Sequence, residues 1–252
     1  SRASSEIPVS REKIDDYAAA RDFVAPVLKL DCRLNPSALS VDLAEALKAL
    51  EPFGHGNPVP VFGIFGVTLQ RIMPIGGGKH LRLIFSKGEN SFQALLFGMT
   101  KERFCFEEGD LLDAAVTVEL NTYNGETGIT VKVKALRMNG TDDEKLFDEL
   151  KCFGDYMSGR KTDAKALLPT RKEAGTVYRL IASAPVPEDR IKYLNINTIG
   201  YAKTAVSLLT LTELGLIARD SSGYYRAVRV DRKTELTNSS VYRNLLERSE
   251  TV

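Results

Sequence analysis

The sequence predicts a multidomain chain of mixed α and β structure, and three observations support this prediction. The chain has 252 residues, a length that two domains accommodate better than one. Residues 61–137 alternate apolar and polar positions between turn signals, as β-strands do. The chain after residue 145 carries helix signals instead, among them a capping box and a broad apolar stripe. We therefore expect β structure first and a helix-rich part after it.

Composition bounds the class of protein. Positive and negative charges nearly cancel, giving a net charge of +1, so the chain as a whole is no polycation. Cys32, Cys105 and Cys152 are far apart and lack CxxC spacing, which argues against a disulfide framework and a zinc site and fits a reducing cytosol. The sequence shows no signal peptide, lipidation motif or long apolar run, so we expect no membrane association. It begins at Ser1 without Met, and we expect a fragment or a processed chain.

The β part reads as five strands. Gly76-Gly77-Gly78 permits any turn after the first strand, and Asn124-Gly125 is the strongest hairpin signal in the chain. The longer connection at residues 98–110 has room for one or two helical turns around Thr100–Phe104. Three strands, a short helical crossover and a two-strand hairpin describe a five-stranded OB-fold β-barrel. The expected strands are Val61–Arg71, His80–Ser86, Ser91–Phe97, Leu111–Leu120 and Ile129–Leu136.

A rigid corner, Leu50–Phe62, precedes the first of these strands. Its three prolines fix their own φ angles and disfavour the α region for the residues before them, while its two glycines allow turns. The corner thus ends a helix over Val41–Leu50, and we expect Phe53 and Phe62 to anchor it to the core. A hinge with buried aromatics is one interpretation, and a ligand contact by His55 or Asn57 is the other. A further helix is expected over Ser10–Val24.

The C-terminal part resembles a winged helix in the order of its elements. Thr170 and Glu173 form a capping box at a helix start, and Gly215 follows the best helix of the chain at the position that favours glycine. The acidic segment Asn139–Glu144 is a plausible boundary before this part. The expected elements are helices over Lys145–Met157, 171–183, Pro187–Asn195, Ile199–Leu214 and Asn238–Arg248, a loop over Ser158–Lys165, and a hairpin over Leu216–Val230. The fold class is therefore an OB-fold β-barrel followed by a winged-helix-like α+β domain.

The corner also carries a family resemblance. LEPFGHGNPVPVF resembles the PFG-x-GNP-x-P-x-F segment that opens the OB-fold domain of the RecJ family, the bacterial single-stranded-DNA-specific exonucleases. Lys79-His80-Leu81, Gly109-Asp110 and Glu119–Gly125 match as well, so the resemblance covers roughly Ile7–Arg137. It implies the C-terminal part of such a nuclease. The expected domains are 1–25, a DHHA1-like tail that the resemblance implies, 26–138, an OB-fold domain with a linker helix, and 139–252, the winged-helix-like domain that the element order predicts.

The resemblance also has consequences for chemistry. It implies 5′→3′ exonuclease activity, single-stranded DNA and DNA-repair proteins as partners, a cytoplasmic location, and a catalytic core in which Asp and His residues hold two Mn²⁺ or Mg²⁺ ions. This sequence has only His55 and His80, and it lacks an Asp-His-His triplet. We therefore expect no catalytic residue and no metal or other cofactor in this chain, the core lying outside it. Thr130-Val131 and Ala135 replace residues that are usually Gln-Leu and Asp in the family.

The expected ligand surface follows from the fold. OB-fold barrels bind oligonucleotides on the face of their second and third strands and between their first and fourth loops. No acidic residue occurs in Val59–Gly88, a stretch that is either a solvated face or an anion-binding surface. Gly76–Lys79 lacks the spacing of a phosphate-binding P-loop. Tyr123 either stacks on a base or covers the barrel end, and Phe85 and Phe92 are candidates for the core or for this face. The candidate nucleic-acid-binding residues are Arg71, Lys79, His80, Arg82, Asn121, Tyr123 and Asn124.

Two functions remain open. Arg226, Arg229, Arg232 and Lys233 make the expected wing basic, but the long helix before it has only Lys203, which is poor for a DNA-reading helix. This domain either contacts DNA or packs against protein. The first hypothesis is the single-stranded-DNA-binding part of a RecJ-type exonuclease, and the second is a stand-alone, non-catalytic adaptor that binds protein partners.

Overall fold

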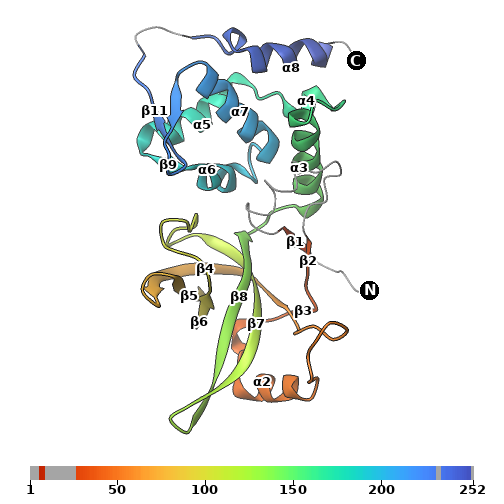
Figure 1. Cartoon of the computed structure of the whole chain (residues 1–252), viewed down its shortest axis with the longest axis vertical. Helices are drawn as coiled ribbons and strands as arrows, with labels where there is room; N and C mark the ends of the chain where they lie inside the picture. Colours follow the sequence, from red (N-terminus) through yellow and green to blue (C-terminus); the bar gives the residue numbers. More distant parts are fainter. Residues whose placement is uncertain (1–5, 9–26, 231–233, 251–252) are drawn as a thin grey trace. The chain divides into compact units, whose positions relative to one another are not determined.

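The computed structural model describes residues 6–8, 27–230 and 234–250, with the side chains of Glu6–Pro8, Val27 and Tyr123 left undescribed. Among these residues the chain forms two compact units, and the boundary between them in the sequence lies between Gly140 and Thr141 (Figure 1). We call them the barrel unit (6–8 and 27–140) and the helical unit (141–230 and 234–250). The expected helix over Ser10–Val24 and the expected wing residues Arg232 and Lys233 lie outside the described residues.

Five strands close a barrel, as the sequence predicts. β5 pairs with β4 and β6, β8 pairs with β6 and β7, and β7 returns to β4, so that the order β4-β5-β6-β8-β7 closes on itself. Only the β6–β8 contact is parallel among these pairings. This is the connectivity of an OB fold. The strands are β4 (Phe62–Ile75), β5 (His80–Lys87), β6 (Asn90–Leu96), β7 (Leu111–Tyr123) and β8 (Glu126–Met138).

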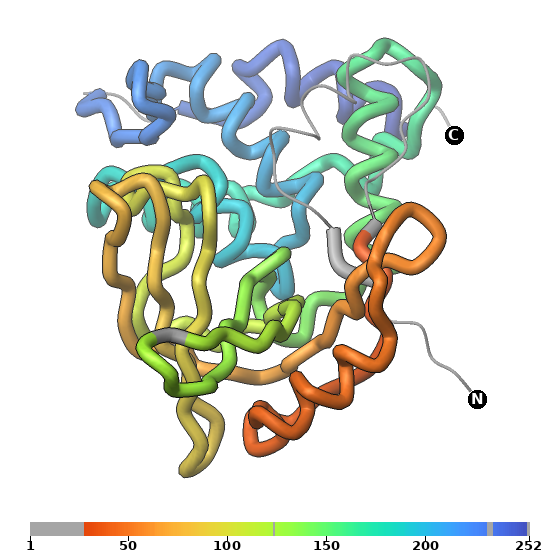
Figure 2. Tube along the Cα trace, turned by 60° about the horizontal axis from the view of Figure 1, so that its bottom comes forward, coloured from red at the N-terminus to blue at the C-terminus, as the bar shows by residue number. Residues whose placement is uncertain are grey.

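The hairpin between β7 and β8 is longer than expected. Both strands extend past the predicted ends and meet at Asn124-Gly125, whose positive φ angles of 51° and 82° suit a two-residue hairpin turn. Helix α2 (Val41–Lys48) packs along this hairpin (Figure 2). Ser40 caps α2, accepting a hydrogen bond from the N–H of Leu43 at 3.2 Å.

The connection around Thr100–Phe104 contains one helical turn, the lower limit of the one or two turns that the sequence predicts. The Phe104 N–H closes this turn on the Thr100 carbonyl at 3.1 Å, and no regular element follows it before β7. Phe104 and Phe106 pack edge to face with centroids 5.6 Å apart, and Phe106 is buried. This ring contact anchors the chain that follows the turn to the buried Phe106.

A buried ion pair supports the barrel core. Asp113 accepts hydrogen bonds from Arg137 Nε at 3.1 Å, from the Gly66 N–H at 3.0 Å and from Asn139 Nδ2 at 2.6 Å. The side chains of Asp113 and Arg137 are only 2% and 9% exposed. The largest fully buried side chains of the barrel are apolar: Phe85, Ile64, Leu69, Leu81, Leu83 and Leu112.

The proline-rich corner is held by its own polar groups. Asn57 Nδ2 donates to the carbonyls of Leu50 and Pro52 at 2.7 and 3.2 Å. Phe62 is buried and Phe53 partly buried, as expected for anchors, while His55 is exposed. The short elements before β4 are β1 (Glu6–Pro8), which pairs with β2 (Val27–Lys29), then β3 (Cys32–Arg33), which pairs with β4, and the 3-10 helix η1 (Pro36–Ala38).

The helical unit has the element order of a winged helix. Strand β11 lies between β10 and β9, and the helices α5, α6 and α7 precede the β10–β11 hairpin. The predicted loop over Ser158–Lys165 is cut short, because Asp163 caps a brief helix, α4. The elements are α3 (Asp143–Met157), α4 (Ala164–Leu167), α5 (Arg171–Ser183), β9 (Val186–Pro187), α6 (Glu188–Asn195), α7 (Tyr201–Glu213), β10 (Ile217–Arg219), β11 (Tyr224–Ala227), the 3-10 helix η2 (Leu236–Asn238) and α8 (Ser240–Glu250).

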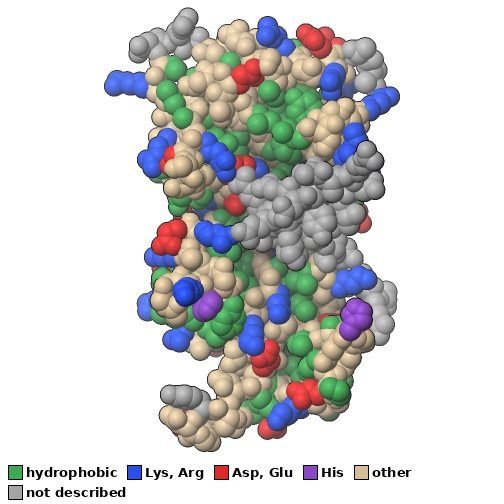
Figure 3. Space-filling model, viewed as in Figure 1, with side chains coloured by type: hydrophobic (Ala, Val, Ile, Leu, Met, Phe, Trp, Pro, Cys, Tyr) green, Lys and Arg blue, Asp and Glu red, His purple; other side chains and the backbone are tan. Residues whose placement is uncertain are grey.

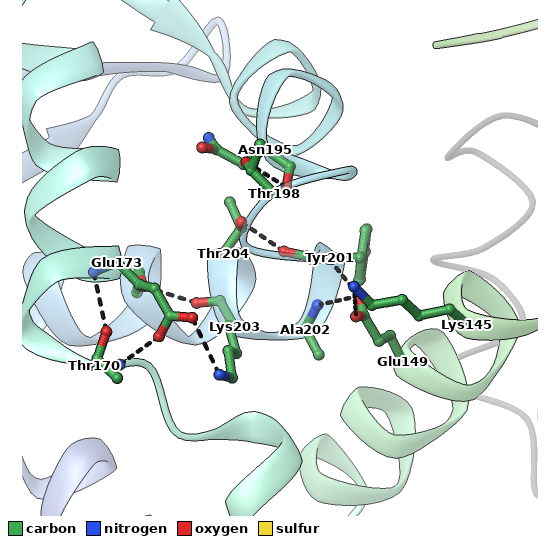
Figure 4. A network of polar contacts seen from close by, with 12 residues as sticks. Lys145, Glu149, Thr170, Glu173, Asn195, Thr198, Tyr201, Ala202, Lys203 and Thr204 are labelled. Atoms are coloured by element: carbon green, nitrogen blue, oxygen red, sulfur yellow. Dashed lines mark hydrogen bonds and ion pairs between the residues drawn. The ribbon is translucent and has the colours of Figure 1, made fainter. Parts of the chain in front are cut away.

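Both ends of α7 have specific caps. At its C-terminus Gly215 adopts a φ of 69°, and the N–H of Leu216 reaches the Leu211 carbonyl at 3.0 Å, a Schellman motif. At its N-terminus Glu149 of α3 accepts hydrogen bonds from the N–H groups of Tyr201 and Ala202 (Figure 4). The predicted start at Ile199 is two residues early, because Gly200, with a φ of 94°, breaks the helical geometry.

Helix α7 is buried from two sides within the helical unit. Leu208 and Leu211 pack in a cluster with residues of α5, α6 and the small sheet. Ala202 and Val206 pack in a second cluster with residues of α4 and α8. The helix that occupies the reading position in DNA-binding winged helices is therefore covered here.

Candidate nucleic-acid interface

The pairing of β5 with β6 decides which side chains point into the barrel. Leu81, Leu83 and Phe85 pair with Leu96, Ala94 and Phe92, and these residues fill the interior. Side chains alternate along a strand, so His80, Arg82 and Ile84 point outward, beside Gln93 and Leu95 of β6. Phe85 is fully buried and stacks on Phe92 at a centroid distance of 5.3 Å. Phe85 and Phe92 therefore belong to the barrel core and not to the ligand-binding face.

A β-bulge brings Arg71 to the same outer surface. Leu69 pairs with Phe85 and points inward, and regular alternation would make Arg71 point inward as well. The register shifts at Gln70, so that Arg71 pairs with Ile84 and Met73 pairs with Arg82. A bulge of this kind re-aims the side chains that follow it. Gln70 Nε2 donates to Ser86 Oγ at 2.7 Å across the two strands.

The outer surface continues across the junction of β6 and β8. Leu95 pairs with Lys132, Lys132 pairs with Thr117, and the same alternation places Asn121 of β7 on this side. Lys132 Nζ lies 2.5 Å from Glu119 Oε2, and both side chains are partly exposed. We call this surface the outer face; it consists of Arg71, Met73, His80, Arg82, Ile84, Gln93, Leu95, Asn121 and Lys132.

The other sequence-predicted candidates lie at turns. Lys79 is exposed in the four-residue turn between β4 and β5, and Asn124 forms the hairpin tip, where its positive φ explains the residue type. Tyr123 is in β7 by its backbone, and its side chain lies outside the described residues. The structure therefore brings Arg71, His80, Arg82 and Asn121 onto one face and leaves Lys79 and Asn124 at its turns.

One aromatic residue near this face was not predicted from the sequence. Phe97 follows Leu96, the last residue of β6, and its side chain is 50% exposed. Its ring packs edge to face against His80 with centroids 5.1 Å apart. His80 Nδ1 accepts a hydrogen bond from the Gly98 N–H at 2.9 Å, which orients the imidazole. Strict alternation along β6 from the buried Ala94 could have marked Phe97 as outward-pointing.

Both sides of the outer face have an acidic residue nearby. On the β4–β5 side, which holds Arg71 and Arg82, Glu108 Oε1 accepts a hydrogen bond from the Ile72 N–H at 2.9 Å, and on the β7–β8 side Glu119 offsets Lys132. Lys87, the fourth basic residue of the acid-free stretch, donates a hydrogen bond to the Phe65 carbonyl at 2.7 Å and so stabilises the barrel. Figure 3 shows basic and hydrophobic side chains interspersed on the visible surface of the barrel unit. Cations beside apolar side chains suit a ligand with both phosphates and flat bases.

A separate cavity of about 240 Å³ lies between α2, the corner and β7. Leu47, Phe53, Pro60, Val118 and Leu120 supply its apolar lining, with charged groups of Lys48, Glu51 and Glu119 also present. None of the basic outer-face residues Arg71, His80 or Arg82 belongs to it.

The described part of the chain offers no ready site for a metal ion. No three His, Cys, Asp or Glu residues within it gather closely enough to hold one. The donor set that a two-metal phosphodiesterase needs does not fit these residues, so we derive no metal-dependent step for them. Over the same described ranges, no helix combines the length and apolarity needed to cross a membrane.

Comparison with known proteins finds a family match for the barrel. Residues 30–135 match the family described as the RecJ OB domain. The barrel unit is therefore similar to a RecJ OB domain. Several sequence features within the matched range have folding roles: Asn57 holds the corner, Gly109 donates its N–H to the Leu69 carbonyl at 2.7 Å, and Asn124-Gly125 makes the hairpin turn.

Similarity to whole RecJ proteins is partial. The chain is 29% identical over 136 residues to the single-stranded-DNA-specific exonuclease RecJ of Thermus thermophilus, covering 52% of this chain and 18% of that protein. Crystal structures of RecJ from the same organism are similar in complex with Mn²⁺ (26% identity, 48% of this chain, 18% of the other, TM-score 0.35) and with Mg²⁺ (24%, 50%, 19%, TM-score 0.37). The chain thus spans less than a fifth of the length of these relatives.

Proposed function

We propose that the barrel unit binds single-stranded DNA across its outer face. The observation that supports this best is the bulge at Gln70, which turns Arg71 outward beside Arg82. In the register of β4 and β5, Ile84 pairs with Arg71 and Met73 pairs with Arg82, so each cation has an apolar side chain opposite it. Cations can neutralise phosphates while the apolar side chains receive unstacked bases, which a duplex would hide.

Each candidate residue then has a role. Arg71, Lys79 and Arg82 neutralise phosphates, and His80 offers Nε2, because Nδ1 is engaged by Gly98. The Asn121 amide can donate to or accept from a base edge. Tyr123 and Asn124 form the far end of the hairpin, which flanks the path.

We further propose that the chain is the DNA-binding part of a RecJ-type 5′→3′ exonuclease. The family match of the barrel and the similarity to a single-stranded-DNA-specific exonuclease support this proposal. The metal-dependent core and any contact with DNA-repair proteins lie outside what the described residues contain. Cys32, Cys105 and Cys152 are not disulfide-bonded, which fits a reducing, cytoplasmic setting.

The test is the salt dependence of oligonucleotide binding. Replacing Arg82 or Lys79 with Ala should weaken binding to all single-stranded sequences and lower the log–log salt slope by roughly 0.7 for each phosphate that is no longer neutralised. Lys151→Ala is the matched control, since Lys151 is exposed on α3 of the helical unit and belongs to none of the barrel strands. Wild-type binding and an unchanged slope in both Arg82→Ala and Lys79→Ala would refute the proposed face.

For the helical unit we propose a second role, as an adaptor surface that binds protein partners. Its long helix α7 is covered on two sides, and Arg226 on the wing strand is paired with Asp220 at 3.4 Å. We therefore expect the chain to prefer single-stranded over double-stranded DNA of equal length in a competition assay. Equal or tighter binding to the duplex would instead assign DNA reading to the wing, around Arg226 and Arg229.

A further inference from the structure

We infer that Phe97 and His80 form a stacking subsite for one unpaired nucleobase. The inference deepens the proposed function and rests on it, because it assigns a base contact within the same single-strand path. The family match by itself gives Phe97 no role, so the inference depends on the contacts and exposure of this ring.

Exposure separates Phe97 from the structural aromatics of the barrel. Half of its side chain is accessible, whereas Phe62 and Phe106 are 6% and 5% exposed and Phe85 is fully buried. Phe97 follows the last residue of β6 and contacts His80, which points outward because its neighbour Leu81 is fully buried in the barrel. The exposed ring thus adjoins the outer face and is not a filler of the core.

The contacts of His80 hold the aromatic pair in place before any ligand arrives. The Gly98 N–H fixes the imidazole through Nδ1, and the Phe97 ring packs edge to face against it. The preceding turn also lies close, since a Cβ on Gly76 would come within 3.1 Å of His80 Cδ2. A ring that is already ordered loses little conformational freedom when a base stacks on it.

The charge around the pair favours a nucleobase that is linked to phosphates. Lys79 precedes His80 directly, and Arg82 is the next outward residue of β5. The segment that contains Phe97, from Asn90 to Lys101, has no acidic residue. A base on the Phe97 ring would therefore have cations near its flanking phosphates, as strand-binding surfaces provide.

The chain has no tryptophan, which gives a direct assay. Phe97→Trp should bind a single-stranded oligonucleotide as the wild type does, and its fluorescence should be quenched on binding through stacking with a base. The matched control is Phe147→Trp, at a residue of α3 that is 39% exposed and belongs to the helical unit. Equal quenching of both tryptophans would overturn the inference.

Affinity provides the second readout. Phe97→Ala should weaken single-strand binding by about 5- to 150-fold, the range for loss of one stacked base, without changing the salt slope. Phe97→Tyr should retain binding, and since the side chain is half exposed, thermal melts should show both variants folded. Unchanged binding by Phe97→Ala with weakened binding by Arg82→Ala would refute the subsite alone. Unchanged binding by Phe97→Ala, Arg82→Ala and Lys79→Ala would refute the proposed function as well.

Discussion

Glu213 links the end of α7 to the start of α8, and its removal should destabilise the helical unit in a pH-dependent way. Its carboxylate accepts hydrogen bonds from Ser239 Oγ at 2.5 Å, from the N–H groups of Ser240 and Val241 at 3.0 and 3.1 Å, and from Ser240 Oγ. It thus caps a helix that belongs to another segment. A carboxylate at the C-terminus of its own helix α7 is unfavourable, so these donors outweigh a repulsive dipole.

The hydrogen bonds from Ser239 and Ser240 lower the pKa of Glu213 from 4.5 to about 2. A lowered pKa means that the carboxylate stabilises the folded state above pH 4.5 and that this contribution disappears as pH falls from 4.5 toward 2. The full pKa difference corresponds to at most about 3.4 kcal/mol. The side chain is largely exposed, so solvent screening reduces the expected contribution to about 1–2 kcal/mol.

Urea unfolding of the wild type and of Glu213→Gln measures this contribution directly. We expect a loss of about 1–2 kcal/mol in the free energy of unfolding at pH 7, shrinking toward zero near pH 2. Asp148→Asn, which removes an exposed carboxylate from α3, is the control and should change stability little. A Glu213→Gln difference that is absent at pH 7, or equal at about pH 7 and about pH 2.5, would refute the reasoning.

Three further predictions concern two other residues and the nuclease activity of the isolated chain. Gly200→Ala should cost about 1–3 kcal/mol, because its φ is 94° and a Cβ would meet Glu149 Oε1; an unchanged melting temperature would contradict this. Asp113→Asn should cost about 3–5 kcal/mol in urea unfolding by leaving Arg137 buried without its carboxylate, and a loss below about 1 kcal/mol would be inconsistent with the ion pair's importance. The purified chain should release no nucleotides from single-stranded DNA with Mn²⁺ or Mg²⁺, and metal-dependent release free of contaminants would overturn that expectation.

Local signals made the strands and caps predictable. Asn124-Gly125 defined its hairpin, and the Thr170–Glu173 capping box is present with both hydrogen bonds, at 3.2 and 2.6 Å. These signals act within a few residues, so tertiary context does not alter them. The short helical turn at Thr100–Phe104 was predictable in the same way, whereas the contact of Phe104 with the buried Phe106 was not.

The candidate face was only partly predictable, for a related reason. The acid-free stretch identified Arg71 and Arg82, but the bulge at Gln70 that places both on one surface depends on pairing with β5. Lys132 joins the face through its pairing with Leu95, and Phe97 adjoins it through contact with His80. Registers between strands that are distant in sequence cannot be read from one strand alone.

The parallel contact between β6 and β8 has a consequence for the barrel's dynamics. In the described register a single pair, Leu95 and Lys132, joins these strands, whereas β7 and β8 are paired along most of their length. Few backbone hydrogen bonds mean low local stability, so amide hydrogens there should exchange faster than those between β7 and β8. A DNA strand lying from Arg82 to Lys132 would bridge this junction. Slower exchange at the junction would then report occupancy of the outer face without any label on the DNA.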